Sequence, residues 1–246
     1  MTASPPPGAP PSKRVNQTFS IRHARTSEAG ELHEFLFGQR KDNLRWRTEE
    51  SVAALIKTSA FYLVTRAPDH SPTGCCFLEE TLDNGAPAVE FGGVWVDTPY
   101  RGKGLFRLLA QATIGCYYIT EYESATKPMP LVAHVARGNE YPRKTMEYLG
   151  FTIRDRDQGY DPAGIPGLEH LPVAEDGKVY GDLYTFDPAN FVGVLSALVA
   201  HDATGFVRGR DSEKSKVTIE IPVLKPKTVA AVLARITSTD NGGYLR

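Results

Sequence analysis

Apolar residues recur along the chain in two patterns. Runs rich in β-branched and aromatic residues predict strands, whereas apolar residues spaced three and four positions apart predict amphipathic helices. The longest helical stripe covers residues 103–121. The predicted strands are 18–22, 61–65, 74–79, 88–96, 131–136, 151–154, 180–186 and 216–223, and the other predicted helices are 28–36, 48–56, 141–149, 191–198 and 229–236.

The order of these elements indicates a mixed α/β (α+β) fold. Strands and helices follow one another as β-α-α-β-β-β-α-β-α-β-β, and the turn Asp83-Asn84-Gly85 links two consecutive strands as an antiparallel hairpin. An α-β-α unit follows. We therefore expect a Pro-rich disordered tail at 1–15, a main domain at 16–187 with a long loop or lid at 156–178, and a C-terminal α-β-α extension at 188–246.

Composition narrows the class of protein. The formal net charge is −1, so no overall field attracts the chain to nucleic acid or to an anionic membrane. The three cysteines lack the spacing of a disulfide framework or a zinc site. No apolar run approaches the roughly 18 residues of a membrane span, and the N-terminus lacks the apolar segment of a secretory signal. We expect a soluble, cytoplasmic protein without a metal, a nucleic-acid partner or a membrane partner.

The turn Arg101-Gly102-Lys103-Gly104 carries the clearest chemical signal. It follows a predicted strand that ends at Val96, and it leads into the longest predicted helix. A helix N-terminus presents backbone N–H groups without intrahelical partners and a partial positive charge. Glycines let a ligand approach the backbone, and two cations add to the attraction. The turn therefore predicts a cradle for phosphate.

These residues resemble the coenzyme A signature of the GNAT (GCN5-related N-acetyltransferase) superfamily, which reads Arg/Gln-x-x-Gly-x-Gly/Ala after a strand Val. Arg101, Gly104 and Val96 occupy the matching positions. A second family motif, an Asn ahead of a helix that ends in Gly-Phe, matches Asn139 and the pair at 150–151. The resemblance covers about residues 18–155. It implies the GNAT fold, a central and mostly antiparallel twisted sheet flanked by helices, and an acyl-CoA-dependent N-acyltransferase.

The resemblance also implies how the donor, by default acetyl-CoA, is held. The turn and the first helical residues would bind the diphosphate, and the strand backbone before them would pair with the pantetheine arm. Asn139 would fix the acyl chain or cap the following helix. The acceptor would be a small-molecule or peptide amine. The implied donor-binding residues are Val94, Trp95, Val96, Arg101, Gly102, Lys103, Gly104, Leu105, Phe106 and Asn139.

Glu90 and Tyr148 are the candidate catalytic residues. Glu90 lies on the strand where some histone-acetylating family members carry their general base, a role that requires burial to raise its pKa. The alternative is a strand-end Glu that faces solvent or pairs with a cation. Met146 stands where the family often has the Tyr that protonates the leaving thiolate. Tyr148, Tyr141 or a water molecule would then supply that proton.

Other positions leave alternatives open. Phe106 replaces a small residue of the motif, so it either crowds the diphosphate or points into the sheet. His134 lies between apolar residues, which favours a hydrogen-bonded core residue over a base. The acidic loop 156–178 suggests a cationic acceptor.

Three hypotheses therefore compete. The first is a catalytic amine acyltransferase that uses acetyl-CoA or a bulkier donor such as succinyl-CoA, as a fainter resemblance to arginine N-succinyltransferases would imply. The second is a module that binds CoA without catalysis. The third is a scaffold whose residues 188–246 form a homodimer or bind a partner.

Overall fold

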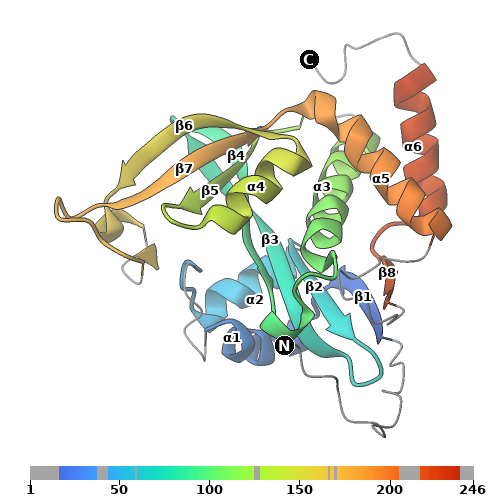
Figure 1. Cartoon of the computed structure of the whole chain (residues 1–246), viewed down its shortest axis with the longest axis horizontal. Helices are drawn as coiled ribbons and strands as arrows, with labels where there is room; N and C mark the ends of the chain where they lie inside the picture. The colour runs from blue at the N-terminus through green and yellow to red at the C-terminus, as the bar shows by residue number, and fades with distance from the viewer. Residues whose placement is uncertain are drawn as a thin grey trace, which may run out of the picture.

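The computed structural model describes residues 17–37, 44–58, 60–124, 128–165, 167–168, 171–204 and 217–238. The tail predicted at 1–15 lies outside these residues. Within them the chain forms a single sheet with helices against both faces (Figure 1). The order of elements agrees with the order predicted from the sequence.

The sheet has eight strands in the order β6-β7-β5-β4-β3-β2-β1-β8. Only two neighbouring pairs, β4 with β5 and β1 with β8, are parallel, so the predicted mostly antiparallel α/β fold class is confirmed. The strands are β1 (Gln17–His23), β2 (Phe61–Arg66), β3 (Ser71–Asp83), β4 (Ala86–Val96), β5 (Leu131–Ala136), β6 (Phe151–Tyr160), β7 (Val179–Phe186) and β8 (Val217–Glu220).

Two groups of helices cover the two faces. On one face, α1 and α2 pack over a core that includes Phe61 and Trp95. On the other face, α3 lies against the sheet and α5 and α6 lie beside it (Figure 1). Every residue from Leu108 to Ile119 is buried, because α3 is covered on both sides and not along a single stripe. The helices are α1 (Ala29–Phe37), α2 (Glu49–Lys57), α3 (Leu105–Glu123), α4 (Glu140–Leu149), α5 (Phe191–Thr204) and α6 (Pro226–Ser238).

The described part of the C-terminal extension completes the main sheet. Strand β8 pairs in parallel with β1, and α5 and α6 contribute Leu195, Leu198 and Val232 to the same core as α3. The described residues 188–204 and 217–238 therefore bury apolar side chains against the main sheet. None of the described helices combines the length and the apolar composition that crossing a membrane requires.

The loop predicted at 156–178 begins later than expected, because β6 continues to Tyr160 and forms a long hairpin with β7 (Figure 1). Two register shifts interrupt this pairing, and Asp157 adopts a positive φ of 49°. The buried carboxylate of Asp182 accepts a hydrogen bond from the Asp157 backbone N–H at 3.1 Å. It thereby satisfies an N–H that the register shift removes from the hydrogen bonding between β6 and β7. The polar sequence of an exposed edge strand explains why this segment reads as a loop.

A bulge bends β4 next to its junction with β5. Cys75 pairs with Trp95 and Phe77 pairs with Gly92, so β4 has one residue more than β3 over this stretch. Gly93 has a φ of 59°, and a Cβ there would lie 1.8 Å from the Phe77 ring. Only glycine fits both the conformation and the space.

Candidate active site

A gap opens between β4 and β5 beyond the bulge. The two strands pair only at Val89 with Leu131 and at Glu90 with Val132. Over the described residues 91–96 and 133–136 no further pairing joins them, while the opposite edges pair with β3 and β7. Each strand therefore turns one edge of backbone N–H and C=O groups toward the gap, which is the requirement for an extended ligand that binds like an added strand. The stretch Val94–Val96, expected to contact the donor, lines this edge.

The glycine-rich turn lies at the open end of the gap, between β4 and α3. Gly102 and Gly104 have φ of 76° and 80°, and a Cβ at Gly102 would meet nothing within 4 Å. Gly104 is the N-cap of α3 and offers no side chain to cap the first N–H groups of the helix. Arg101 donates from Nε to the Val96 carbonyl oxygen at 2.9 Å, and Lys103 bonds to the Gln17 side chain of β1. The turn thus combines open space, helix N–H groups and two cations.

Leu105 and Phe106 can contribute to such a cradle through their backbone only. The Leu105 side chain is 1% exposed, and the Phe106 ring packs against the core that contains α3. This packing favours the alternative in which Phe106 points into the sheet.

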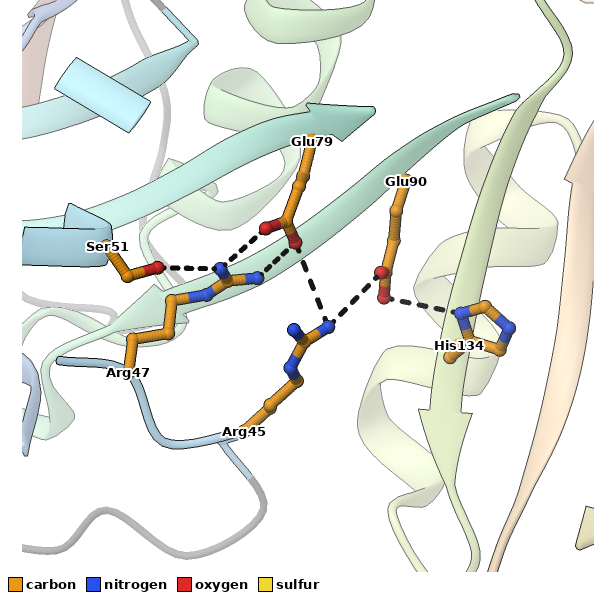
Figure 2. A network of polar contacts seen from close by, with 6 residues as sticks. All are labelled: Arg45, Arg47, Ser51, Glu79, Glu90 and His134. Carbon is orange, nitrogen blue, oxygen red and sulfur yellow. Dashed lines mark hydrogen bonds and ion pairs between the residues drawn. The ribbon is translucent and has the colours of Figure 1, made fainter. Parts of the chain in front are cut away.

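Five charged or ionisable side chains meet on the sheet face that carries α1 and α2, where the gap between β4 and β5 begins (Figure 2). Glu79 of β3 and Glu90 of β4 are direct cross-strand neighbours. Like charges in that position destabilise a sheet unless cations compensate them. Arg45 and Arg47, in the extended segment before α2, supply that compensation from above the two strands, and His134 of β5 reaches Glu90 from the other side (Figure 2).

The two arginines are held differently. Arg47 is 4% exposed and binds both carboxylate oxygens of Glu79, one of them at 2.9 Å, while its guanidinium stacks 4.3 Å from the Phe77 ring centre. Arg45 is 30% exposed and lies 3.8 Å from Glu79 and 3.7 Å from Glu90. The α2 N-cap that follows them, in which Thr48 accepts the Ser51 N–H, fixes where the segment ends.

Glu90 and His134 form a carboxylate–imidazole pair. His134 Nδ1 lies 3.3 Å from Glu90 Oε1, and the ring meets Tyr160 edge-on at 5.3 Å between centroids. Burial, the largest single effect, would raise the pKa of Glu90, but the hydrogen bond with His134 and the neighbouring basic groups together lower its pKa below 4.5. The condition for Glu90 as a general base, a pKa raised by burial, is therefore not met, and the alternative of a Glu that pairs with a cation agrees with its contact to Arg45. The expectation that His134 belongs to the core is also wrong, because its side chain is 34% exposed.

The remaining predicted residues lie elsewhere. Tyr148 is 62% exposed on α4, and its hydroxyl accepts a hydrogen bond from Arg107 of α3 at 2.9 Å. Arg107 does not belong to the Glu90 cluster. Asn139 occupies the N-cap of α4 but makes no side-chain capping bond, which removes the capping alternative. Met146, at the position of the family's Tyr, is 3% exposed within the core.

Two segments meet across the face that carries these charges. The Trp46 N–H donates to the Gly167 carbonyl oxygen at 3.4 Å, which joins the arginine segment to the β6–β7 connection. Gly167 has a φ of 90°, and a Cβ there would lie 2.1 Å from the Trp46 carbonyl oxygen. This contact holds the segment that carries Arg45 against the β6–β7 connection.

The acidic residues around the β6–β7 connection do not form a cation site among the described residues. Four of them make local contacts: Asp155 with Arg154, Asp157 with Arg137, Asp161 with the Ala163 N–H, and Asp176 with Tyr180 and Lys178. Glu169 lies outside the described residues. Of these four, only Asp155 and Asp157 pair with a cation, so the cationic acceptor stays a prediction.

Sequence reasoning missed three features of this site. His134 was assigned to the core, and neither Arg45 nor Tyr160 was considered. The adjacent glycines at 92–93 within a strand were an available signal for the bulge, because glycine inside a strand often marks one. No comparable signal existed for Arg45, since its contacts with residues 79 and 90 are distant in sequence.

Comparison with known proteins gave structural matches only. No protein-family model and no curated protein sequence matches the chain. A GNAT-family acetyltransferase from Streptococcus pneumoniae matches with a TM-score of 0.48 and 16% identity over 68% of this chain and 98% of its own. The acetyltransferase yncA of Salmonella typhimurium, solved with acetyl-CoA, matches with 0.49 and 16% over 68% and 92%. NAA60 of Arabidopsis thaliana, solved with a bisubstrate analogue, matches with 0.49 and 13% over 68% and 97%.

The family indicated by the sequence motifs is thus also the family of a matched structure. With identities and TM-scores this low, the matches carry no inference about the chemistry of this chain.

Proposed function

We propose that this chain is an acyl-CoA-dependent N-acyltransferase of the GNAT type that transfers an acetyl group from acetyl-CoA to an amine by direct attack in a ternary complex. One observation supports this most: the gap between β4 and β5 has the glycine-rich turn at its open end and the pair Glu90–His134 at its closed end. A ligand with a diphosphate, an extended arm and a reactive end matches that order of features.

The donor would be held mainly by backbone. The first-turn N–H groups of α3, together with Arg101 and Lys103, would bind the diphosphate oxygens. The edge of Val94–Val96 that faces the gap would pair with the amides of the pantetheine arm. A backbone N–H near Trp95 or Val96 would stabilise the oxyanion as the carbonyl is attacked. The Asn139 side chain, which caps no helix, would face the acyl chain.

In this proposal His134 is the general base and Glu90 positions it. When Nδ1–H donates to Glu90 Oε1, the lone pair of Nε2 remains to accept a proton. The lowered pKa keeps Glu90 ionised, so it stabilises the imidazolium that forms. The amine nitrogen bonds to the thioester carbonyl carbon, its proton passes to His134, and the carbon–sulfur bond breaks to release the CoA thiolate. Holding the amine and the thioester at attack distance contributes up to about 7–11 kcal/mol.

The thiolate must then be protonated. We propose that the proton held by His134 passes to it, directly or through water, because Met146 cannot transfer one. Tyr148 is the competing donor. Replacing Tyr148 with Phe removes the hydroxyl and keeps the ring; an unchanged kcat excludes Tyr148 as the acid, and a loss of about 100-fold or more assigns it that role.

The proposal is tested by thiol release from acetyl-CoA in the presence of a panel of amines. His134→Asn should lower kcat by about 10²–10⁴-fold, and Arg101→Glu should raise the KM for acetyl-CoA with a smaller effect on kcat. His70, on the exposed turn between β2 and β3, provides a matched control, since His70→Asn should leave both constants unchanged.

A second outcome has its own interpretation. CoA-dependent thermal stabilisation that Arg101→Glu abolishes, without product from any amine, would identify the chain as a CoA-binding module. If CoA gives no thermal stabilisation and no amine gives turnover, both readings are refuted. A bulkier acyl donor and a homodimer through the C-terminal extension stay predictions, tested with succinyl-CoA as the donor and by the mass of the intact chain in solution.

A further inference from the structure

The sheet consists of two halves that meet along a short seam between β4 and β5. Strands β6, β7 and β5 form one half, and β4, β3, β2, β1 and β8 form the other. Only Val89 with Leu131 and Glu90 with Val132 are paired across the seam. The gap described above begins at one end of these two pairs. The position of one half against the other therefore sets the distance between the two strand edges that face the gap.

An ion pair joins the two halves beyond the other end of the seam. Asp83, the last residue of β3, accepts hydrogen bonds from both Nη atoms of Arg154 on β6, one of them at 2.7 Å. Asp83 is opposite Ala86, which precedes the seam on β4. Three strands separate β3 from β6 in the order of the sheet, so the sheet curls until its edge strand reaches the β3–β4 hairpin. Nε of Arg154 also donates to Asp155 at 3.0 Å, so two carboxylates fix the guanidinium.

This ion pair lies on the sheet face that carries Glu90 and His134. Asp83 and Glu79 are four residues apart on β3, and alternate residues of a strand point to the same face. On that face an apolar cluster takes one residue from each of β4, β5 and β7, and all three are 0–3% exposed: Ala88, Val132 and Leu183. The cluster spans the seam. The two halves are therefore held together on this face by the ion pair and by a small buried contact.

His134 is in contact with both halves. In its own half the imidazole meets the Tyr160 ring edge-on at 5.3 Å between centroids. In the other half its Nδ1 lies 3.3 Å from Glu90 Oε1 (Figure 2). N–H···O bonds usually measure about 2.7–3.2 Å, so this bond is already long and a small further separation would break it. The orientation of the His134 ring therefore depends on how the two halves are placed.

We propose, on the basis of the function proposed above, that Arg154 is a positioning residue whose bond to Asp83 fixes the two halves of the sheet and thereby holds the His134 ring on Glu90. The hydrogen bonds from Arg154 hold the pKa of Asp83 below its ordinary value although burial would raise it, so the carboxylate stays ionised near neutral pH. Without the bond, β6 separates from the β3–β4 hairpin, and His134 no longer donates from Nδ1 to Glu90. The imidazole then loses the orientation that leaves Nε2 able to accept a proton.

The kinetic test removes each partner of the ion pair. Arg154→Gln and Asp83→Asn should each lower kcat by about 10- to 100-fold, because a misplacement of about 1 Å can cost about 100-fold. The KM for acetyl-CoA should change less, because the glycine-rich turn and Val94–Val96 belong to the same half of the sheet. The double variant should lose no more than either single variant, since the second substitution breaks a bond that the first has already broken.

Two further variants separate this role from general stability. Arg154→Lys keeps the charge and loses the planar fork, so it should recover part of kcat. Arg22→Gln is the matched control, because Arg22 also binds both carboxylate oxygens of one partner, Glu28, but next to the far side of the sheet at β1. It should leave kcat unchanged. Thermal midpoints of all variants show that each protein is folded at the temperature of the assay.

A second measurement follows His134 without any turnover. Long-range ¹H–¹⁵N NMR correlations show which imidazole nitrogen carries the proton, and the signal that is absent from His134→Asn identifies His134. In wild type and in Arg22→Gln the neutral ring should carry its proton on Nδ1, which donates to Glu90. In Arg154→Gln the signal should shift to a mixture of the two tautomers.

The outcomes separate this proposal from the function on which it rests. An unchanged tautomer of His134 in Arg154→Gln overturns the positioning role, whatever the effect on kcat. A loss of kcat in Arg22→Gln equal to that in Arg154→Gln also overturns it, because the loss would then reflect general destabilisation. If wild type releases no thiol with any amine, the acyltransferase proposal fails, and the tautomer still decides whether Arg154 positions the ring.

Discussion

Replacing Arg47 with Met tests how the site tolerates two carboxylates side by side. Arg47 neutralises Glu79, which lies directly opposite Glu90, and its side chain also contacts Ser51 and the Phe77 ring. Met keeps most of the apolar contact and removes the charge. Breaking a buried ion pair costs about 3–5 kcal/mol. Because Glu79 is 27% exposed, water recovers part of that cost, and we expect a loss of about 2–3 kcal/mol.

Unfolding in urea, followed by circular dichroism and by fluorescence of Trp46 and Trp95, measures the loss. With an m value near 3 kcal/mol/M, the upper range for small proteins, the midpoint should fall by about 1 M. Glu79→Gln should be costly by itself, because it leaves Arg47 without a charged partner. Arg47→Met combined with Glu79→Gln should lose less than the sum of the two, with a coupling of about 1–2 kcal/mol. Lys227→Met, on the exposed first turn of α6, is the control and should stay within about 0.5 kcal/mol of wild type.

Two results would refute this reasoning. A midpoint for Arg47→Met within about 0.2 M of wild type would mean that the Glu79 charge needs no compensation. Strict additivity of the two substitutions would mean that Arg47 stabilises the fold only through its apolar contacts.

Three further predictions follow from single positions. Gly93→Ala should lower the free energy of unfolding by about 2–4 kcal/mol and weaken acetyl-CoA binding, because it combines a positive φ with a Cβ 1.8 Å from the Phe77 ring. A urea midpoint near that of wild type would contradict the bulge. Gly167→Ala should raise the KM for the acceptor, because the added Cβ would lie 2.1 Å from the Trp46 carbonyl oxygen. Gly164→Ala, whose Cβ would meet nothing within 4 Å, should leave that KM unchanged. Equal effects of the two substitutions would show that the contact between Gly167 and Trp46 has no role in acceptor binding. Wild type should be more stable than Glu90→Gln, and this advantage should be complete above the ordinary pKa of 4.5 and shrink as the pH falls through the lower folded pKa, because the carboxylate stabilises the fold only while it is ionised. Urea unfolding at neutral pH and near pH 3 measures the difference. A difference that stays constant between the two pH values would exclude the linkage.

The sequence alone determined the features that depend on residues close to one another in the chain. The order of strands and helices was predictable because side-chain periodicity is a local property. The turn at 101–104 was recognisable because a strand, two glycines and a helix N-terminus adjoin in the chain. The same locality explains why two strands were predicted too short: β3 extends over Ser71–Asp83 and β6 extends to Tyr160, because pairing with neighbouring strands overrides their local polar sequence.

The tertiary structure decided everything that depends on which strands become neighbours. His134 reaches Glu90 because β5 pairs with β4 in a register that ends there, and 44 residues separate the two in the chain. That contact helps to lower the Glu90 pKa against the effect of burial, and a strand pattern can predict the burial but not the charged partners. Arg45 reaches the same carboxylate from a segment before α2 that carries no motif. The glycine-rich turn predicts a phosphate site from the sequence, and only the folded sheet shows what lies at the other end of the gap.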